Sequence, residues 1–336
     1  MMAELSVNSR LDRNGLTEEE FLKTYNPGDY ERPSVAADMA IFTVTEGEED
    51  NYRKLPEKKL GILLIQRGGH PYLGAWALPG GFVRPHETAE QTARRELREE
   101  TGLDQVYMEQ LCTVSDPGRD PRTWVMSCSY MALIDSTRIK LQAGDDADNA
   151  CWFGITFRLM DEHTDYLKDE STAENIKAIR IQHYELELEK ESPRLKSESW
   201  KSMESPRLKD ESWNGSGSTV LRSVIEKRIT RTEDHAITEY NITENSGLAF
   251  DHAKIIAYAL ERLRGKVESS GLALHLMPSE FTLTGLQQVY EVILGRHLLK
   301  AAFRRKAAAL VEETGFFTEN EGHRPSRLYR KKWEEF

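Results

Sequence analysis

Hydrophobic and polar positions change period several times along the chain, and these changes predict strands mixed with helices. Apolar or alternating runs predict strands at 35–44, 60–66, 106–114, 124–134 and, more briefly, 151–153. Two later runs, 220–230 and 237–242, are typical of a hairpin. Between 248 and 267 the apolar residues recur every three or four positions, which predicts a helix. This mixture predicts an α/β fold.

One helix is predicted by its ends as well as by its spacing. Thr88 with Gln91 three residues later forms a capping box, and Gly102 stands where a left-handed terminating residue is favoured. We therefore expect a helix over 89–101. The same capping pattern predicts a short helix over 17–25.

The helix over 89–101 carries three carboxylates beside its apolar stripe. At 100° per residue, Glu96, Glu99 and Glu100 lie towards the buried side and away from the solvated arginines. Like charges so placed repel unless a cation lies among them, and oxygen ligands favour Mg²⁺ or Mn²⁺ over zinc. A Glu-rich helix is otherwise typical of a solvated surface. The preceding glycine pair favours a site, because its backbone can approach a metal or phosphate closely.

Residues 81–103 resemble the Nudix box along its whole length. Gly81 is followed after five residues by Glu87, and after seven more by the run RELREETGL that begins at Arg95. Nudix enzymes hydrolyse a nucleoside diphosphate linked to another group. The resemblance therefore implies a Nudix α/β/α sandwich and metal-dependent hydrolysis at a diphosphate.

The Nudix resemblance also implies a role for each charged residue of the stretch. The implied metal-binding residues are Glu96, Glu99, Glu100, Gly80 and Gly81. The implied catalytic residues are the same three glutamates together with Arg95 and Glu87, which would pair to brace the turn on the helix. A metal that bridges two phosphates neutralises the leaving charge and lowers the pKa of a bound water.

The polar stretch 115–122 between two predicted strands is either a plain connection or a substrate loop. Arg119 and Arg122 are candidates for contact with a phosphate or ribose, and Arg67 is a third substrate-binding candidate. Pro117 resembles a proline found in this region of ADP-ribose-directed Nudix enzymes.

Composition places the chain among ordinary globular proteins. Of its 336 residues, 30% are charged and 39% hydrophobic, with a net charge of −11. No apolar run approaches 18 residues and the start lacks an apolar signal core, so we expect a cytoplasmic protein with no membrane contact. Its three cysteines, Cys112, Cys128 and Cys151, lack metal-ligand spacing and are expected to be buried free thiols.

Two polar segments lie in the later part of the predicted Nudix domain. The acidic run 144–148 is either a turn or a late metal ligand. In the second segment, ESPRLKSESW at 191–200 recurs as ESPRLKDESW at 204–213. Proline, serine and mixed charge predict a flexible insertion over about 188–217.

The C-terminal part predicts a winged helix. A helix over 282–294, a second over 298–310, and strands at 314–317 and 327–332 follow one another within about sixty residues. Residues 296–336 hold ten basic against six acidic side chains. The DNA-binding candidates are Lys300, Arg304, Arg305, Arg324 and Arg327. A dimerisation module with a solvated basic face is the alternative. Asp251 and His252 are expected to be a first-turn acid and a surface histidine.

Residues 248–332, including LAFDHAK, FTLT, FRRK and HRPSRLY, resemble the C-terminal half of the Nudix-related transcriptional regulators of NAD metabolism. The resemblance implies a homodimer in which a Nudix-like domain senses ADP-ribose or a related nucleotide and a winged helix binds operator DNA. We expect an N-terminal extension over 1–33, a Nudix domain over 34–247, a connecting helix over 248–267 and a winged helix over 268–336.

Two functions follow from these resemblances. The whole Nudix box favours a Mg²⁺-dependent hydrolase that cleaves the diphosphate of ADP-ribose or a related nucleotide, and the sequence ranks this enzyme first. The alternative is an ADP-ribose-responsive repressor whose Nudix domain is mainly a sensor. The alanines at 301 and 302, early in the second tail helix, leave few base-reading side chains there.

Overall fold

The computed structural model describes residues 11–47, 56–138, 147–166, 178–191, 219–318 and 325–332. Within these ranges ten strands form one mixed sheet, whose main path runs β10-β9-β8-β7-β2-β1-β6-β5. At its centre β1 (Ser34–Glu46) pairs antiparallel with β2 (Lys58–Arg67) and parallel with β6 (Val125–Leu133). Beyond β6, β5 (Tyr107–Val114) forms the edge, and a single-turn η3 (Ser136–Arg138) follows β6.

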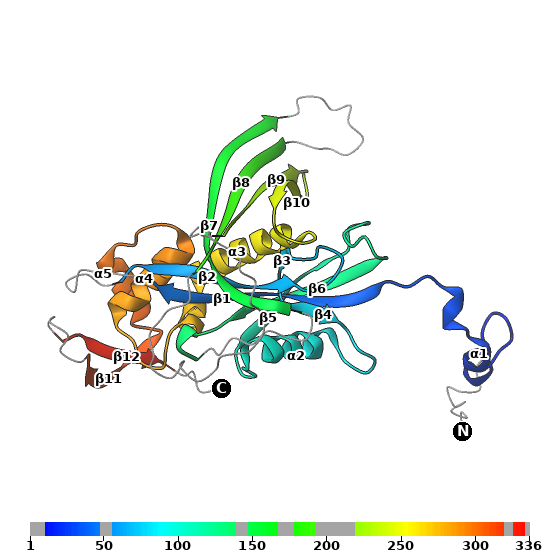
Figure 1. Ribbon diagram of the computed structural model, residues 1–336, viewed down its shortest axis with the longest axis horizontal. Helices are drawn as coiled ribbons and strands as arrows, with labels where there is room; N and C mark the ends of the chain where they lie inside the picture. Colours follow the sequence, from blue (N-terminus) through cyan, green and yellow to red (C-terminus); the bar gives the residue numbers. More distant parts are fainter. Residues whose placement is uncertain are drawn as a thin grey trace, which may run out of the picture.

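Helices cover both faces of the central strands (Figure 1). Met39 and Ile41 of β1 pack with Ala93 and Leu97 of α2 (Ala89–Thr101). The alternate residues of β1, such as Phe42, belong to a second core that includes α3 (His252–Ser269) on the other face. Because successive side chains of a strand point to opposite faces, both sets are buried. The predicted α/β/α sandwich is confirmed.

Two short strands bring the glycine-rich turn against the sheet. β3 (Trp76–Ala77) pairs with β2, and β4 (Gly80–Phe82) pairs with the first half of β1. The turn that leads into α2 therefore starts beside β1, at the middle of the sheet.

Four antiparallel strands extend the sheet away from this body (Figure 1). They are β7 (Ala147–Tyr166), β8 (Ala178–Lys190), β9 (Val220–Arg231) and β10 (Ala236–Ser246). The sequence predicted only 151–153 of β7 and none of β8. The predicted insertion also begins too early, because Leu188 is a buried residue of β8. The repeat from 192 to 213 lies outside the described residues, as does 144–146 of the acidic run.

The predicted N-terminal helix is present as α1 (Glu18–Thr24), followed by the short η2 (Pro27–Asp29). Thr17 and Glu20 form the expected capping box. Neither helix contains a buried residue, and Figure 1 shows this segment standing away from the body.

The C-terminal part has the predicted winged-helix order. After α3 and η5 (Leu272–Leu276) come α4 (Leu283–Leu294), α5 (Lys300–Ala307) and the hairpin of β11 (Val311–Phe317) and β12 (Arg327–Lys331). The second helix is shorter than predicted, because Leu298 and Leu310 both lie outside it. The first hairpin strand starts earlier, at Val311.

The three cysteines are free thiols, as expected, but all are partly exposed and none is buried. None of the helices in the described ranges is long and apolar enough to cross a membrane.

Candidate functional site

The turn before α2 needs glycine at two successive positions, because there is no room for a side chain at either. A side-chain carbon on Gly80 would lie 2.5 Å from the carbonyl oxygen of Ala37, and one on Gly81 would overlap the carboxylate of Glu96. Backbone without side chains can therefore approach both β1 and α2 closely. The turn holds the start of the Nudix box against the acids of the helix.

Local capping fixes the bounds of α2 as predicted. The hydroxyl of Thr88 accepts a hydrogen bond from the Gln91 amide, and Gln91 accepts one from the Thr88 amide. Gly102 ends the helix in the left-handed region at φ 71°. Both ends rest on contacts within a few residues, so the whole helix was readable from the sequence.

Arg95 makes the pair with Glu87 that the Nudix resemblance implied. Its Nε donates to Oε1 of Glu87 at 3.0 Å, and its Nη2 donates to Oε2 at 3.2 Å. This hydrogen bonding outweighs the effect of partial burial and lowers the pKa of Glu87 to about 2. The Glu87 carboxylate is therefore ionised at neutral pH and ties the turn to the helix.

The same arginine also holds two of the three helix acids. Its Nη1 lies 2.5 Å from Oε1 of Glu96 and 3.4 Å from Oε2 of Glu99. Glu100 is buried beside them, with 4% of its surface exposed. Burial raises the pKa of Glu96 despite its pairing with Arg95. Of the three acids expected towards the buried side, Glu96 and Glu100 lie there, whereas the side chain of Glu99 is 43% exposed.

In donor chemistry these residues fit a divalent cation. All three side chains offer carboxylate oxygens, the ligand type that Mg²⁺ and Mn²⁺ prefer, and the backbone of the glycine turn lies directly against the Glu96 carboxylate. However, within the described ranges no three His, Cys, Asp or Glu side chains are grouped so as to hold a metal. The expected three-carboxylate group is thus not assembled here, because Arg95 holds Glu96 and Glu99.

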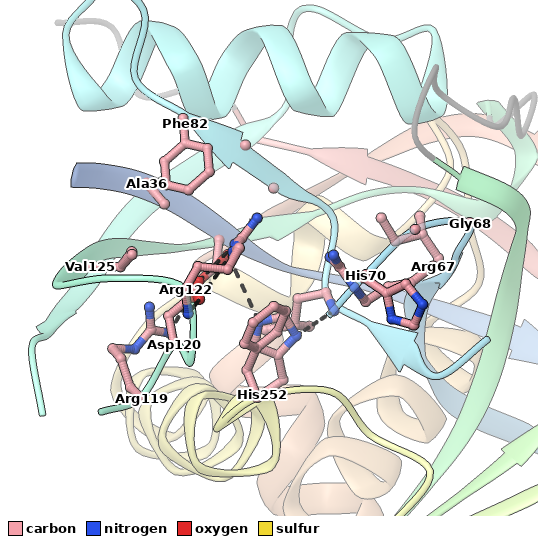
Figure 2. A pocket seen from close by; sticks show the side chains of 17 residues that line it. Ala36, Arg67, Gly68, His70, Phe82, Arg119, Asp120, Arg122, Val125 and His252 are labelled. Carbon is pink, nitrogen blue, oxygen red and sulfur yellow. Dashed lines mark hydrogen bonds and ion pairs between the residues drawn. The ribbon is translucent and has the colours of Figure 1, made fainter. Parts of the chain in front are cut away.

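A cavity of about 420 Å³ lies beside this turn, between β1, β4, the loop 115–122 and the start of α3. Its lining includes Gly80 and Gly81, so it shares a wall with the Nudix box. All three predicted substrate arginines line it, together with two aromatic rings and two histidines: Arg67, Arg119, Arg122, Phe82, Phe250, His70 and His252. Figure 2 shows Phe82 on one side of the cavity and His252 on the other.

Two of the arginines lie over aromatic rings. The guanidinium of Arg122 lies 5.2 Å from the ring centre of Phe82 and 5.8 Å from that of Phe250, and it pairs with Asp120. Arg67 lies 5.0 Å from the Phe250 ring. A guanidinium attracted to an aromatic ring is held in place, and its planar set of N–H donors suits a phosphate.

Arg119 is far more enclosed than a simple phosphate contact would be. Only 5% of its side chain is exposed. It donates to both carboxylate oxygens of Asp251, at 2.9 and 2.7 Å, and lies 3.4 Å from Asp38. The sequence placed Arg119 in a substrate site but did not predict these two partners.

His252 is buried, so its prediction as a surface histidine was wrong. It is 4% exposed, and its Nδ1 accepts a hydrogen bond from the Leu78 amide at 2.9 Å. Burial lowers the pKa of His252, so the ring is neutral at pH 7 and carries its proton on Nε2, 3.9 Å from Asp38. The helical spacing of Ile255 and Ile256 already places residue 252 on the apolar face of α3. That signal was overlooked.

The basic residues of the winged helix lie where the sequence placed them, with one pairing that it missed. Lys300, Arg304 and Arg305 are exposed on α5. Arg327 on β12 is exposed as well, but it donates to both carboxylate oxygens of Glu313. Arg324 lies outside the described residues.

Known proteins resemble this chain in both parts. The NUDIX domain family matches residues 53–164, and the NrtR DNA-binding winged helix domain family matches residues 273–331. The ADPR responsive transcriptional repressor NtrR of Acinetobacter baylyi is 30% identical over 321 residues, which cover 94% of this chain and 89% of the relative. The chain belongs to the NrtR family of Nudix proteins.

Two further likenesses bear on this NrtR-family chain. The structure of Shewanella oneidensis NrtR complexed with a 27mer DNA aligns with a TM-score of 0.51 and 25% identity, over 89% of this chain and 93% of that one. The ADP-ribose pyrophosphatase of Methanocaldococcus jannaschii is 39% identical over 142 residues, which cover 42% of this chain and 74% of the relative. The first likeness spans both domains of the NrtR family, whereas the second is confined to the Nudix part.

Proposed function

We propose that this protein is an ADP-ribose-responsive DNA-binding regulator whose Nudix domain binds the nucleotide in the cavity beside the glycine turn. One observation carries the proposal: the cavity that gathers three arginines and two aromatic rings opens at the first turn of α3, the helix that leads to the winged helix. The Acinetobacter relative, a repressor described as ADPR responsive, supports this assignment.

The cavity chemistry suits a nucleoside diphosphate. Arg67 and Arg122 supply fixed cationic groups for a diphosphate, and the rings of Phe82 and Phe250 offer apolar faces to a base or ribose. Neutral His252 can donate a hydrogen bond from Nε2 to a ribose hydroxyl or a phosphate oxygen. These side chains come from β2, β4, the loop 115–122, the start of α3 and the residue pair before it, so the ligand would contact each of these elements.

The exposed basic face of α5 supports operator DNA as the partner of the winged helix. Lys300, Arg304 and Arg305 can meet phosphates, and the Shewanella relative was solved with DNA. We also expect two copies of the chain to associate, as DNA-reading winged helices often bind paired half-sites. The unburied apolar residues of the N-terminal segment offer a surface for that contact.

Hydrolysis is a second candidate function, and the whole Nudix box supports it. Glu96, Glu99 and Glu100 would hold a divalent cation, which would supply charge neutralisation and an acidic bound water. Glu96 and Glu99 would first have to turn away from Arg95, while Glu87 would keep that guanidinium in place. The methanogen relative, an ADP-ribose pyrophosphatase, supports this candidate for the Nudix part alone. We rank it second because its acids are held by Arg95 here.

Calorimetry with ADP-ribose, combined with DNA binding, tests the first proposal. Fluorescent duplexes tiled across the DNA beside the protein's own gene are titrated with protein, with and without ADP-ribose. We expect at least one duplex to bind in a salt-sensitive manner and ADP-ribose to change its Kd. Arg122→Ala should weaken ADP-ribose binding without affecting DNA binding in its absence. Arg304→Ala should do the reverse.

The same preparation distinguishes the second candidate. ADP-ribose with Mg²⁺ is incubated with the protein, and release of AMP is measured. Turnover that disappears in Glu99→Gln and Glu100→Gln supports hydrolysis. ADP-ribose binding without AMP release rejects hydrolysis and leaves the regulator. Turnover without any binding to DNA rejects the regulator.

A further inference from the structure

Two ion pairs of opposite polarity hold the loop 115–122 to the first turn of α3. In the inner pair the loop supplies the cation, Arg119, and the helix supplies Asp251. In the outer pair the loop supplies Asp116 and the helix supplies Lys254, with 2.8 Å between Nζ and Oδ2. The loop is thereby fixed to the helix at two points one turn apart.

The inner pair is the stronger of the two. Its side chains are 5% and 15% exposed, whereas those of the outer pair are 24% and 58% exposed. Exposed pairs contribute little because water screens them, whereas removing one partner of a buried pair leaves an uncompensated charge. The contact between Arg119 and Asp251 therefore dominates this attachment.

Asp251 occupies the N-cap position of α3 but does not cap it. An aspartate at this position usually accepts hydrogen bonds from the free amides of the first turn. Here no side-chain cap bond is made, and both carboxylate oxygens accept from Arg119 instead. The first turn of α3 thus lacks its usual partner for as long as Arg119 holds Asp251.

The other end of α3 is attached to the winged helix. Lys306 of α5 donates from Nζ to the carbonyl oxygens of Val267 and Glu268 in the last turn of α3. Arg264 of α3 donates to the carbonyl oxygen of Ile293 in α4 at 3.0 Å. Figure 1 shows α3 running from the central sheet to the helices of the C-terminal part.

We propose that Asp251 is a positioning residue that couples ligand binding in the cavity to the start of α3. An anionic ligand in the cavity competes with Asp251 for Arg119, which lines the cavity. As Arg119 turns to the ligand, the Asp251 carboxylate becomes available to the first-turn amides of α3, where the Lys254 amide now donates to the Asp251 carbonyl oxygen. The hydrogen bonding of the first turn then changes. Because Lys306 and Arg264 hold α3 to α5 and α4, a shift of α3 also moves those two helices. This inference rests on the proposed function, since it takes ADP-ribose as the ligand.

Asp251→Asn tests the exchange directly, because it removes the charge, keeps the shape and changes no residue that lines the cavity. ADP-ribose should bind severalfold more tightly, since Arg119 no longer has to leave a charged partner. The ratio of DNA Kd values with and without ADP-ribose should approach one. Glu261→Gln is the matched control, because Glu261 also holds an ion pair from α3, but to Lys227 of β9. Glu261→Gln should show the same ratio of DNA Kd values as the unmodified protein.

A second readout does not depend on the variant folding or on DNA. Hydrogen exchange of the unmodified protein is compared with and without ADP-ribose over 115–122 and 252–256. Slower exchange at the start of α3 with faster exchange in the loop is expected. An Asp251→Asn variant that keeps the full ligand effect on DNA, or ADP-ribose binding with unchanged exchange at α3, overturns the inference alone. Absence of ADP-ribose binding to the unmodified protein overturns the proposed function and the inference together.

Discussion

Gly81 faces the carboxylate of Glu96 so closely that a methyl group on Gly81 would overlap Oε1 of Glu96. Glu96 is enclosed, with 13% of its side chain exposed, and it is held in an ion pair by Arg95. Neither neighbour can move away without breaking the ion pairs of the turn. The glycine is therefore required by close packing, since its φ is not in the left-handed region.

Gly81→Ala should lower the free energy of unfolding by about 1–3 kcal/mol, the usual effect of overpacking an enclosed site. Gly265→Ala is the matched control. Nothing lies within 4 Å of a side-chain carbon at Gly265, which is exposed within α3, so alanine should raise stability by roughly 0.5–1 kcal/mol. Urea unfolding of both variants measures the difference. Equal stabilities would show that Glu96 moves aside freely.

Mg²⁺ should stabilise the protein against heat if the three acids of α2 bind it. A ligand present at 100 times its Kd adds about 2.7 kcal/mol to the folded state. Glu100→Gln should lose most of the rise in Tm that Mg²⁺ produces, because it removes an enclosed carboxylate oxygen from the set. Asp104→Asn, an exposed acid paired with Arg98 just beyond the helix, should keep the full rise. Identical Mg²⁺ responses in the two variants would place the metal elsewhere.

Local signals made α2 predictable to the residue, whereas long-range partners made the cavity unpredictable. The bounds of α2 depend on Thr88, Gln91 and Gly102, all within or beside the helix. By contrast, Arg119 and Asp251 are 132 positions apart in the chain. Nothing local indicates that they meet, so the sequence placed Arg119 by its loop and missed its partners.

The strands β7 and β8 were missed for different reasons. The outer half of β7 exposes both faces, so residues such as Glu162 give no alternation of apolar and polar positions, whereas β8 does alternate, as in ELELE at 185–189, and that signal was overlooked. The outer halves of the two strands form because each strand pairs with the next along its whole length, with Glu162 opposite Gln182. Hydrogen bonds to the neighbouring strand stabilise these halves, as burial does for the central strands. Such pairing leaves no clear pattern of residues in a single sequence.

His275 should make the protein less stable as the pH falls from about 6.5 towards 4. Burial, together with Lys331, whose Nζ lies 3.2 Å from the ring, lowers its pKa from 6.5 to about 4. The unfolded chain therefore binds a proton in this window before the folded protein does, and stability falls by at most about 3 kcal/mol. Buried His252, whose pKa is also lowered, acts in the same direction.

Urea unfolding between pH 7 and pH 4.5 measures this loss. His275→Gln should lose less stability across the window than the unmodified protein, although it is less stable at pH 7, because it gives up the ring contact with Tyr107. A variant that loses as much stability as the unmodified protein would show that His275 does not titrate in this range.

Removal of single arginines from the DNA face should change the salt dependence of DNA binding. Each phosphate contact contributes about 0.9 to the slope of log K against log salt concentration. Arg304→Ala and Arg305→Ala should each reduce the slope by about that amount. Arg327→Ala should have a smaller effect, because Glu313 already neutralises that guanidinium. Arg94→Ala on α2, an exposed arginine paired with Glu90, should leave the slope unchanged. If all four variants gave the same slope, α5 would not be the DNA-binding surface.

The N-terminal segment should be the principal contact between two copies of the chain. Four of its large apolar residues are 43–61% exposed: Phe21, Leu22, Tyr25 and Tyr30. Where this segment joins β1, the body exposes Phe82 at 41% and Trp124 at 50%. Isolated apolar side chains are ordinary on a surface, but several exposed on one extended segment and on the body beside its junction with β1 are typical of an interface.

Phe21→Ser combined with Leu22→Ser should therefore weaken self-association by a hundredfold or more, since each buried apolar side chain contributes about 1.5–3 kcal/mol. Sedimentation velocity over a range of protein concentrations gives the dimer Kd. The matched control, Glu19→Gln with Lys23→Gln, changes the same helix but removes only an exposed ion pair. It should dimerise like the unmodified protein. If the serine variant also keeps the unmodified dimer Kd, then the segment lies outside the interface and the two copies meet through another face.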